Sequence, residues 1–176
     1  MVDMEGQLHP LIITGDVGSG KSTRLKAYID SCASQDISCG GVISETIYLH
    51  NQRIGYDLIS VASGKRRPSL RTERRMLPPG KAERATSAFW FSLDAFSWAD
   101  ALIKKEISAA HQVICIDEVG RYELQGKGFC DTVRLVTSTP DIVPVLVVRE
   151  TYLEEVIRMF SLYTYTVLRT GEAARE

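Results

Sequence analysis

The segment that most constrains this chain runs from Gly15 to Ser22 and fits the pattern G-x-x-x-x-G-K-[ST] at every defined position. A short apolar run, Leu11–Thr14, ends just before it and is typical of a buried strand. Apolar residues then recur at helical spacing from Lys21 to about Ser34. The sequence therefore predicts a strand, a glycine-rich loop and a helix in succession, which is the arrangement that binds phosphate groups.

The chemistry of this loop suits a nucleoside triphosphate such as ATP or GTP. Backbone N–H groups in a tight glycine loop point inward together, and the following helix adds its N-terminal N–H groups and dipole. We expect Lys21 to be catalytic because it brings a positive charge to the β- and γ-phosphates, and Ser22 to bind Mg²⁺. The residues predicted to contact nucleotide are Gly15, Asp16, Val17, Gly18, Ser19, Gly20, Lys21, Ser22 and Thr23. The alternative is a glycine-rich turn with a chance lysine, which the flanking strand and helix disfavour.

An acidic pair supplies the second half of the predicted site. Val113–Ile116 is another short apolar run, and it ends in Asp117 and Glu118. Carboxylates at the carboxyl edge of a parallel sheet lie where ligands bind. We expect Asp117 to hold Mg²⁺, directly or through water, and Glu118 to orient or deprotonate the attacking water. The alternative is an ordinary exit from a strand into a loop.

The rest of the chain alternates predicted strands and helices around this site. Further strands are predicted over Val42–Tyr48, Arg53–Val61, Phe89–Phe91, Val143–Val148 and Tyr163–Leu168. Further helices are predicted from Asp94 to about Ile107, over Phe129–Val136 and over Leu153–Phe160. We expect a single domain spanning residues 1–176, of the α/β class: a three-layer fold with a mostly parallel sheet flanked by helices. The second and third strands form a hairpin insertion, Gly40-Gly41 break the chain before it, and a basic loop from Ala62 to about Ala85 follows.

Composition excludes several classes of protein. The formal net charge is −1, which gives no global reason to expect a nucleic-acid or membrane partner. No apolar run approaches the roughly 18–20 residues of a membrane helix, and the polar N-terminus is not a secretory signal. The four cysteines lack zinc-ligand spacing and are expected to be free thiols. We therefore expect a cytoplasmic protein without a membrane partner, whose oligomeric state the sequence does not determine.

These residues resemble the small P-loop nucleoside-triphosphatases known from thermophiles, which are related to the animal cancer-related nucleoside-triphosphatase. The resemblance runs from about Leu11 to Val148. Four stretches carry it: Gly15–Thr23, Gly41–Glu45, Arg53–Leu58 with Ser63-Gly64 shortly after, and Ile116–Gly120 followed by Glu123-Leu124.

The resemblance implies slow, Mg²⁺-dependent hydrolysis of several nucleoside triphosphates to diphosphates, on a P-loop fold related to nucleotide kinases and RecA-type ATPases. It also implies that Asp117, Glu118 and Gly120 contact the nucleotide. The chain departs from the family at Asp16, where a small residue or proline is common, and at Arg149, where histidine is common.

The basic segment leaves the function more open. Eight of the chain's basic residues lie between Lys65 and Arg84. They are interpreted as a solvated loop, as a lid whose arginine neutralises the γ-phosphate, or as a nucleic-acid surface on which the aromatic run Phe89–Phe91 stacks bases. A nucleic-acid partner is the least favoured of these, because the aromatic residues also suit a core strand. Hydrolysis is the leading hypothesis. A nucleotide or polynucleotide kinase and a nucleotide-controlled binding module are the alternatives.

Overall fold

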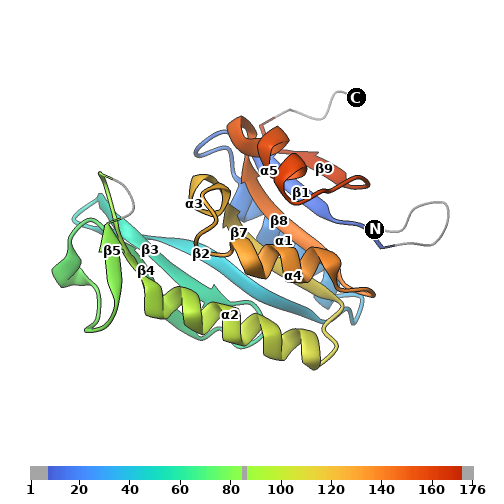
Figure 1. Ribbon diagram of the computed structural model, residues 1–176, viewed down its shortest axis with the longest axis horizontal. Helices are drawn as coiled ribbons and strands as arrows, with labels where there is room; N and C mark the ends of the chain where they lie inside the picture. The colour runs from blue at the N-terminus through green and yellow to red at the C-terminus, as the bar shows by residue number, and fades with distance from the viewer. Residues whose placement is uncertain (1–7, 85–86, 172–176) are drawn as a thin grey trace.

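The computed structural model describes residues 8–84 and 87–171, which form a β-sheet with helices on both faces (Figure 1). The strands are β1 (Leu11–Gly15), β2 (Cys39–Leu49), β3 (Gln52–Ser60), β4 (Arg66–Arg71), β5 (Ala82–Arg84), β6 (Trp90–Ser92), β7 (Val113–Val119), β8 (Val143–Arg149) and β9 (Thr166–Arg169). The α-helices are α1 (Lys21–Ala33), α2 (Leu93–Ser108), α3 (Arg121–Leu124), α4 (Cys130–Ser138) and α5 (Leu153–Met159). Two 3₁₀ helices are η1 (Arg74–Met76) and η2 (Glu150–Tyr152).

The sheet has a parallel half and an antiparallel half. Within the described residues its strand order is β5-β6-β4-β3-β2-β7-β8-β1-β9. Strands β2, β7, β8, β1 and β9 run parallel to one another, as predicted for the core. The predicted hairpin is β2–β3, and with β4, β6 and β5 it extends the same sheet in antiparallel fashion. Strand β8 lies between β1, which ends at the phosphate loop, and β7, which carries the acidic pair.

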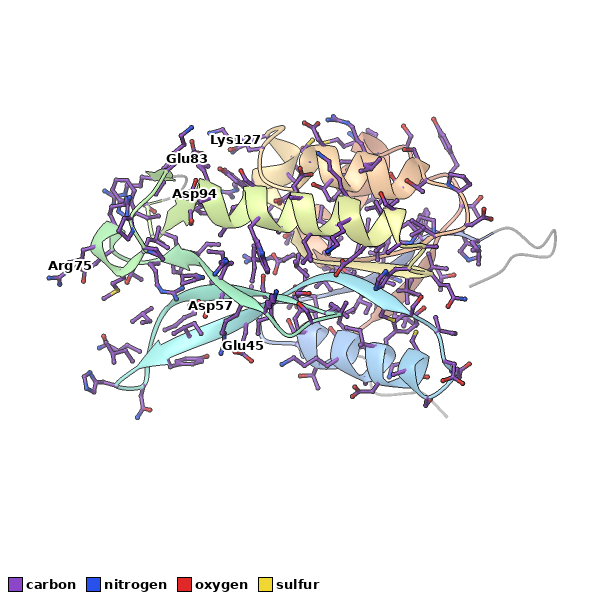
Figure 2. All side chains as sticks on the ribbon, turned by 90° about the horizontal axis from the view of Figure 1, so that it is seen from below. Glu45, Asp57, Arg75, Glu83, Asp94 and Lys127 are labelled. Atoms are coloured by element: carbon purple, nitrogen blue, oxygen red, sulfur yellow. The ribbon has the colours of Figure 1, made fainter. Side chains whose placement is uncertain are left out.

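The helices form the outer two of three layers, as expected for this fold class. Helix α1 covers one face, where Leu25 packs with Leu11 and Ile13 of β1. Helices α2, α4 and α5 cover the other face, where the larger apolar cluster includes Ile103 and Val133. Figure 2 shows α1 on one side of the sheet and these three helices on the opposite side. Burial of apolar side chains on both faces fixes the parallel strands whose ends carry the predicted site.

The prediction that Gly40-Gly41 break the chain is wrong, because both residues lie within β2. Gly41 has a φ of 96° and lies against β7, where an added Cβ would be 2.0 Å from the carbonyl oxygen of Cys115. Its N–H donates to Glu106 Oε2 at 2.6 Å. The glycines therefore permit close packing inside the sheet, and β2 runs from the parallel core into the hairpin without interruption.

The predicted basic loop is also largely wrong, because β4, η1 and β5 lie within it. The buried Arg71 of β4 donates to Asp57 Oδ1 of β3 at 2.5 Å. Arg66 pairs with both Asp57 and Glu45, so that carboxylates on β3 and β2 neutralise these two arginines of β4. Arg66 and Arg71 are thus cross-strand partners in a sheet, and the basic composition does not indicate a solvated loop here.

No helix within the described residues has both the length and the apolar content needed to cross a bilayer.

Candidate active site

The phosphate loop connects the last residue of β1 to the first turn of α1. Gly20, which precedes α1, has a φ of 89°, in the left-handed region that L side chains rarely adopt. Gly20 has no side chain with which to cap the helix, so the first N–H groups of α1 face the loop without a side-chain acceptor. A helix N-terminus of this kind binds anions through its N–H groups and its dipole.

Lys21 lies inside this loop instead of extending into solvent, and only 7% of its surface is exposed. Its Nζ donates to the carbonyl oxygen of Gly15 at 2.9 Å and to that of Asp16 at 2.7 Å. Since an ammonium group has three N–H donors, these two bonds leave one donor and the full positive charge for an anion. The structure thus places Lys21 where the sequence predicts a phosphate-binding cation.

The outer part of the loop is exposed, and its inner side is tied to the end of β9. Asp16, Val17 and Gly18 are exposed, as is Thr23 on the first turn of α1. The Ser19 hydroxyl lies 2.6 Å from that of Thr170, whose N–H donates to the Thr14 carbonyl at 2.8 Å. Thr170 is not among the predicted site residues, because nothing in the local sequence relates a residue after the last strand to this loop.

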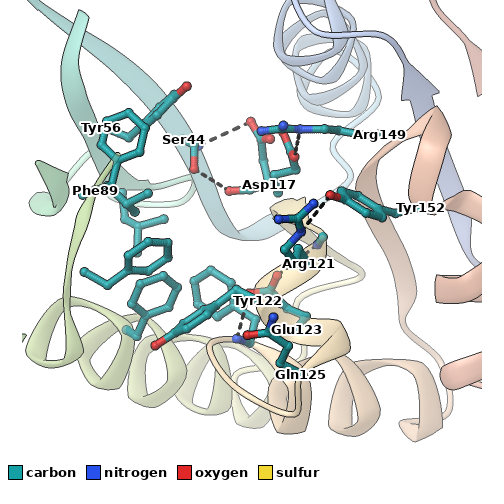
Figure 3. A pocket seen from close by; sticks show the side chains of 17 residues that line it. Ser44, Tyr56, Phe89, Asp117, Arg121, Tyr122, Glu123, Gln125, Arg149 and Tyr152 are labelled. Carbon is teal, nitrogen blue, oxygen red and sulfur yellow. Dashed lines mark hydrogen bonds and ion pairs between the residues drawn. The ribbon is translucent and has the colours of Figure 1, made fainter. Parts of the chain in front are cut away.

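Asp117 of β7 is the acidic residue that contacts the phosphate-loop helix. Its Oδ2 accepts a hydrogen bond from Ser22 Oγ at 3.0 Å and one from the Ser44 N–H at 3.3 Å. The Ser44 hydroxyl donates to the Asp117 carbonyl at 2.7 Å (Figure 3). The structure therefore brings together the two predicted magnesium ligands, Ser22 and Asp117, and adds Ser44, which is not among the predicted site residues.

The environment of Asp117 makes its ionised form costly. Only 2% of the residue is exposed, and its pKa is raised from 3.8 to about 6, chiefly by burial. The negative charge of Glu118 raises this pKa further, whereas the hydrogen bonds from Ser22 and Ser44 and the charge of Lys21 oppose the shift. A buried carboxylate of this kind gains from a bound cation, which replaces the solvation that burial removes.

Glu118 contacts an arginine from the neighbouring strand. Arg149, the last residue of β8, donates from Nε to Glu118 Oε1 at 2.5 Å (Figure 3). In the sheet register Arg149 is the partner of Gly15, where the phosphate loop begins. This arginine therefore lies between the phosphate loop and the acidic pair, at the position where the sequence departs from the family's histidine.

The segment after the acidic pair is held by a buried glutamate. Glu123 accepts from the Gly120 N–H at 2.9 Å and from the Phe129 N–H at 3.2 Å, and it is 3% exposed. Burial raises its pKa from 4.5 to about 7 despite these hydrogen bonds. Glu123 thus supports the backbone at Gly120, whose predicted contact with nucleotide stays a prediction.

A cavity of about 380 Å³ adjoins the acidic pair (Figure 3). Glu118 and Arg149 form part of its wall, together with seven aromatic residues. None of the phosphate-loop residues 15–23, all of which the structure describes, lines it.

The basic segment does not supply the arginine nearest to the acidic pair. Arg75 bonds Glu73, and Arg74 donates to the carbonyl oxygen of Gly80 at 2.7 Å, in addition to the strand pairs described above. Of the aromatic residues proposed to stack bases, Phe91 is buried in the sheet and unavailable for stacking. Arg149 is instead the cation beside Glu118, although the sequence marks it only as a departure from the family.

The comparisons with known proteins agree with this architecture. A family model described as NTPase matches residues 10–170. A cancer-related nucleoside-triphosphatase homolog from Mus musculus is 30% identical over 139 residues, which cover 77% of this chain and 72% of the mouse protein. The solution structure of a human cancer-related nucleoside triphosphatase superposes with a TM-score of 0.74 and 27% identity, covering 95% of this chain and 91% of that one. The crystal structure of THEP1 from the hyperthermophile Aquifex aeolicus has a TM-score of 0.72 and 21% identity, with 94% and 92% covered.

Proposed function

The chain belongs to the NTPase family, and we propose that it hydrolyses nucleoside triphosphates to diphosphate and phosphate in a Mg²⁺-dependent reaction with little selectivity for the base. The observation that carries this proposal is the contact of Ser22 with Asp117 across the end of the phosphate loop. It joins the phosphate-binding half of the site to the acidic half, and both halves are needed for chemistry at a γ-phosphate.

The spacing of these two side chains fits a magnesium ion. Two ligands at right angles in an octahedral shell, each about 2.1 Å from Mg²⁺, lie about 3 Å apart. Ser22 Oγ and Asp117 Oδ2 are 3.0 Å apart. We propose that this hydroxyl and this carboxylate hold the ion, which supplies positive charge to the β- and γ-phosphate oxygens.

The residues of the chain perform the other steps. The N–H groups at the start of α1 and the ammonium group of Lys21 bind the β- and γ-phosphates and stabilise the charge that develops on them. Glu118 orients a water molecule and accepts its proton as the water oxygen bonds to the γ-phosphorus. The bond from this phosphorus to the β–γ bridging oxygen breaks, and the nucleoside diphosphate leaves. Arg149 positions the Glu118 carboxylate through their ion pair.

Low base selectivity follows from where the proposed contacts lie. The loop, the helix N-terminus and the magnesium pair all address phosphate oxygens, and phosphates are common to every nucleoside triphosphate. A slow turnover is implied by the family resemblance.

A panel of nucleoside triphosphates tests the proposal. ATP, GTP, CTP and UTP are incubated with the full chain, with Mg²⁺ or with a chelator, and free phosphate is measured. We expect phosphate release from all four, at rates within about tenfold of one another, and none with the chelator. Phosphate that appears only on an added nucleoside or nucleic-acid end would instead indicate a kinase. Release that continues in the chelator would contradict the role of Mg²⁺.

A further inference from the structure

The cavity beside the acidic pair lies over the antiparallel half of the sheet. Its wall includes Ser44 of β2, Tyr56 of β3, Leu70 of β4 and Phe91 of β6. In the strand order these elements lie on the far side of β7 and β8 from β1, which carries the phosphate loop. The cavity is therefore separate from the phosphate loop, and the two regions meet at the acidic pair.

The two walls of the cavity differ in chemistry. On one side lie aromatic rings, among them Tyr56 and Phe89, whose centroids are 5.9 Å apart in an edge-to-face arrangement. On the other side Figure 3 shows Arg121 and Arg149. Aromatic rings stack against planar bases, whereas guanidinium groups bind phosphate or carboxylate in a bidentate manner. The combination suits a planar aromatic molecule that carries an anionic group.

The wall is held in place by its own hydrogen bonds. Tyr122 donates its hydroxyl to Glu83 at 2.7 Å, and Lys127 donates to the same carboxylate at 3.0 Å. Arg121 donates from Nε to the Tyr152 hydroxyl at 3.2 Å (Figure 3). The volume also lies within the roughly 300–1,000 Å³ typical of small-molecule sites. The cavity is thus preformed and large enough for a nucleotide base.

The next step rests on the proposed function. If that function is correct, the base of the hydrolysed triphosphate does not reach this cavity. With Lys21 and Ser22 at the β- and γ-phosphates, the γ-phosphate is the end of the triphosphate that faces Glu118. The base is attached at the opposite end of the phosphate chain. The cavity lies beyond Glu118, and it therefore takes a different molecule.

We propose that this cavity binds a nucleoside monophosphate at the same time as the phosphate loop binds a triphosphate. The base stacks against Tyr56 and Phe89, and the phosphate group faces Arg121 and Arg149. Because the bound phosphate lies beside Glu118, where the attacking water is oriented, its binding lowers the rate of phosphate release.

Calorimetry on the full chain tests the proposal. The protein is saturated with the non-hydrolysable analogue AMP-PNP and Mg²⁺, and AMP, GMP, CMP and UMP are titrated in turn. We expect at least one monophosphate to bind with a stoichiometry of one, and the Lys21→Ala variant to bind it without AMP-PNP. If no monophosphate binds at millimolar concentration, or if each one only displaces AMP-PNP, the proposal is wrong.

Two substitutions with matched controls test where the monophosphate binds. Phe89→Leu removes a stacking ring and should weaken monophosphate binding about tenfold without changing the affinity for AMP-PNP. Tyr163→Leu is the control, because Tyr163 is 92% exposed and lies outside the cavity. If Phe89→Leu weakens AMP-PNP binding as much as monophosphate binding, the cavity holds the base of the triphosphate itself and the proposal is overturned.

Arg121→Gln tests the anionic end of the ligand. It should weaken AMP more than adenosine, whereas Arg134→Gln, an exposed arginine on α4 outside the cavity, should change neither affinity. Equal losses for AMP and adenosine would contradict a phosphate contact at Arg121. ATP hydrolysis without any monophosphate is measured in parallel, so that failure of the proposed function is recognised separately from failure of the second site.

Discussion

Replacing Glu118 by Gln tests the proposed catalytic role most sharply, because the structure separates its effect on folding from its effect on rate. Glu118 and its partner Arg149 have side chains that are 29% and 43% exposed, so both remain partly in water. Loss of a pair of this kind costs about 1 kcal/mol of stability or less. The variant should therefore fold, with a free energy of unfolding close to that of the unmodified protein.

The expected effect on rate is much larger. A positioned general base contributes about 10²- to 10⁴-fold to a rate, which corresponds to about 3–5 kcal/mol of activation free energy. Glutamine preserves the shape of the side chain but cannot accept the proton of water. We expect kcat for phosphate release to fall at least about a hundredfold, with the affinity for ATP and Mg²⁺ changed only a few-fold.

Three measurements on the same preparation decide the outcome: phosphate release at saturating ATP, calorimetric ATP binding, and chemical unfolding. Arg149→Gln serves as the comparison, because it breaks the same ion pair while leaving the Glu118 carboxylate in place. We expect it to lower kcat less than Glu118→Gln does. If Glu118→Gln hydrolyses ATP within about threefold of the unmodified protein, Glu118 is not the general base.

Three further predictions concern the metal, the sheet and the buried glutamate. Ser22→Ala should raise the Mg²⁺ concentration for half-maximal hydrolysis at least about tenfold. If a metal titration gives the same Mg²⁺ concentration for the variant, Ser22 is not a metal ligand. Gly41→Ala should destabilise the protein far more than Gly126→Ala in chemical unfolding, since both glycines have positive φ but only Gly41 meets a backbone atom. Equal losses would show that the contact with Cys115 is readily relieved. The raised pKa of Glu123 means that its own contribution to the unfolding free energy, about 3 kcal/mol, is fully present below about pH 4.5 and is lost as pH rises through about 7. Glu123→Gln should remove this pH-dependent component when the unfolding free energy is measured as a function of pH. If the variant and the unmodified protein show the same pH dependence, Glu123 does not make this contribution.

The parts of the fold that could be predicted are those with a local signal. Leu11–Thr14 and Val113–Ile116 are apolar runs that end at a glycine and at an acidic residue, and α1 shows helical spacing of its apolar residues. The predicted ends of these segments lie within a few residues of the observed ones. The phosphate-loop motif likewise fixes the positions of Lys21 and Ser22, because its strand and helix follow directly in the sequence.

The parts that could not be predicted depend on neighbours that are distant in sequence. From the sequence alone, Gly41 is predicted to interrupt a strand and Arg71 to lie in a loop. In the structure Gly41 packs against β7, and Arg71 pairs with Asp57 of β3. Ser44 bonds Asp117 from 73 positions away, and Thr170 bonds Ser19 from 151 positions away. No periodicity or local motif in the sequence indicates such pairings. The residues that support the site can therefore be identified only once the strand order of the sheet is known.

The central claim is that the loop around Lys21 binds the phosphates of a nucleoside triphosphate, and calorimetric titration with ATP and excess Mg²⁺ tests it most directly. We predict one ATP bound per chain and loss of that binding in Lys21→Ala, whose unfolding transition should remain cooperative. The absence of detectable ATP binding by the unmodified chain, or undiminished binding by a folded Lys21→Ala variant, would contradict the account.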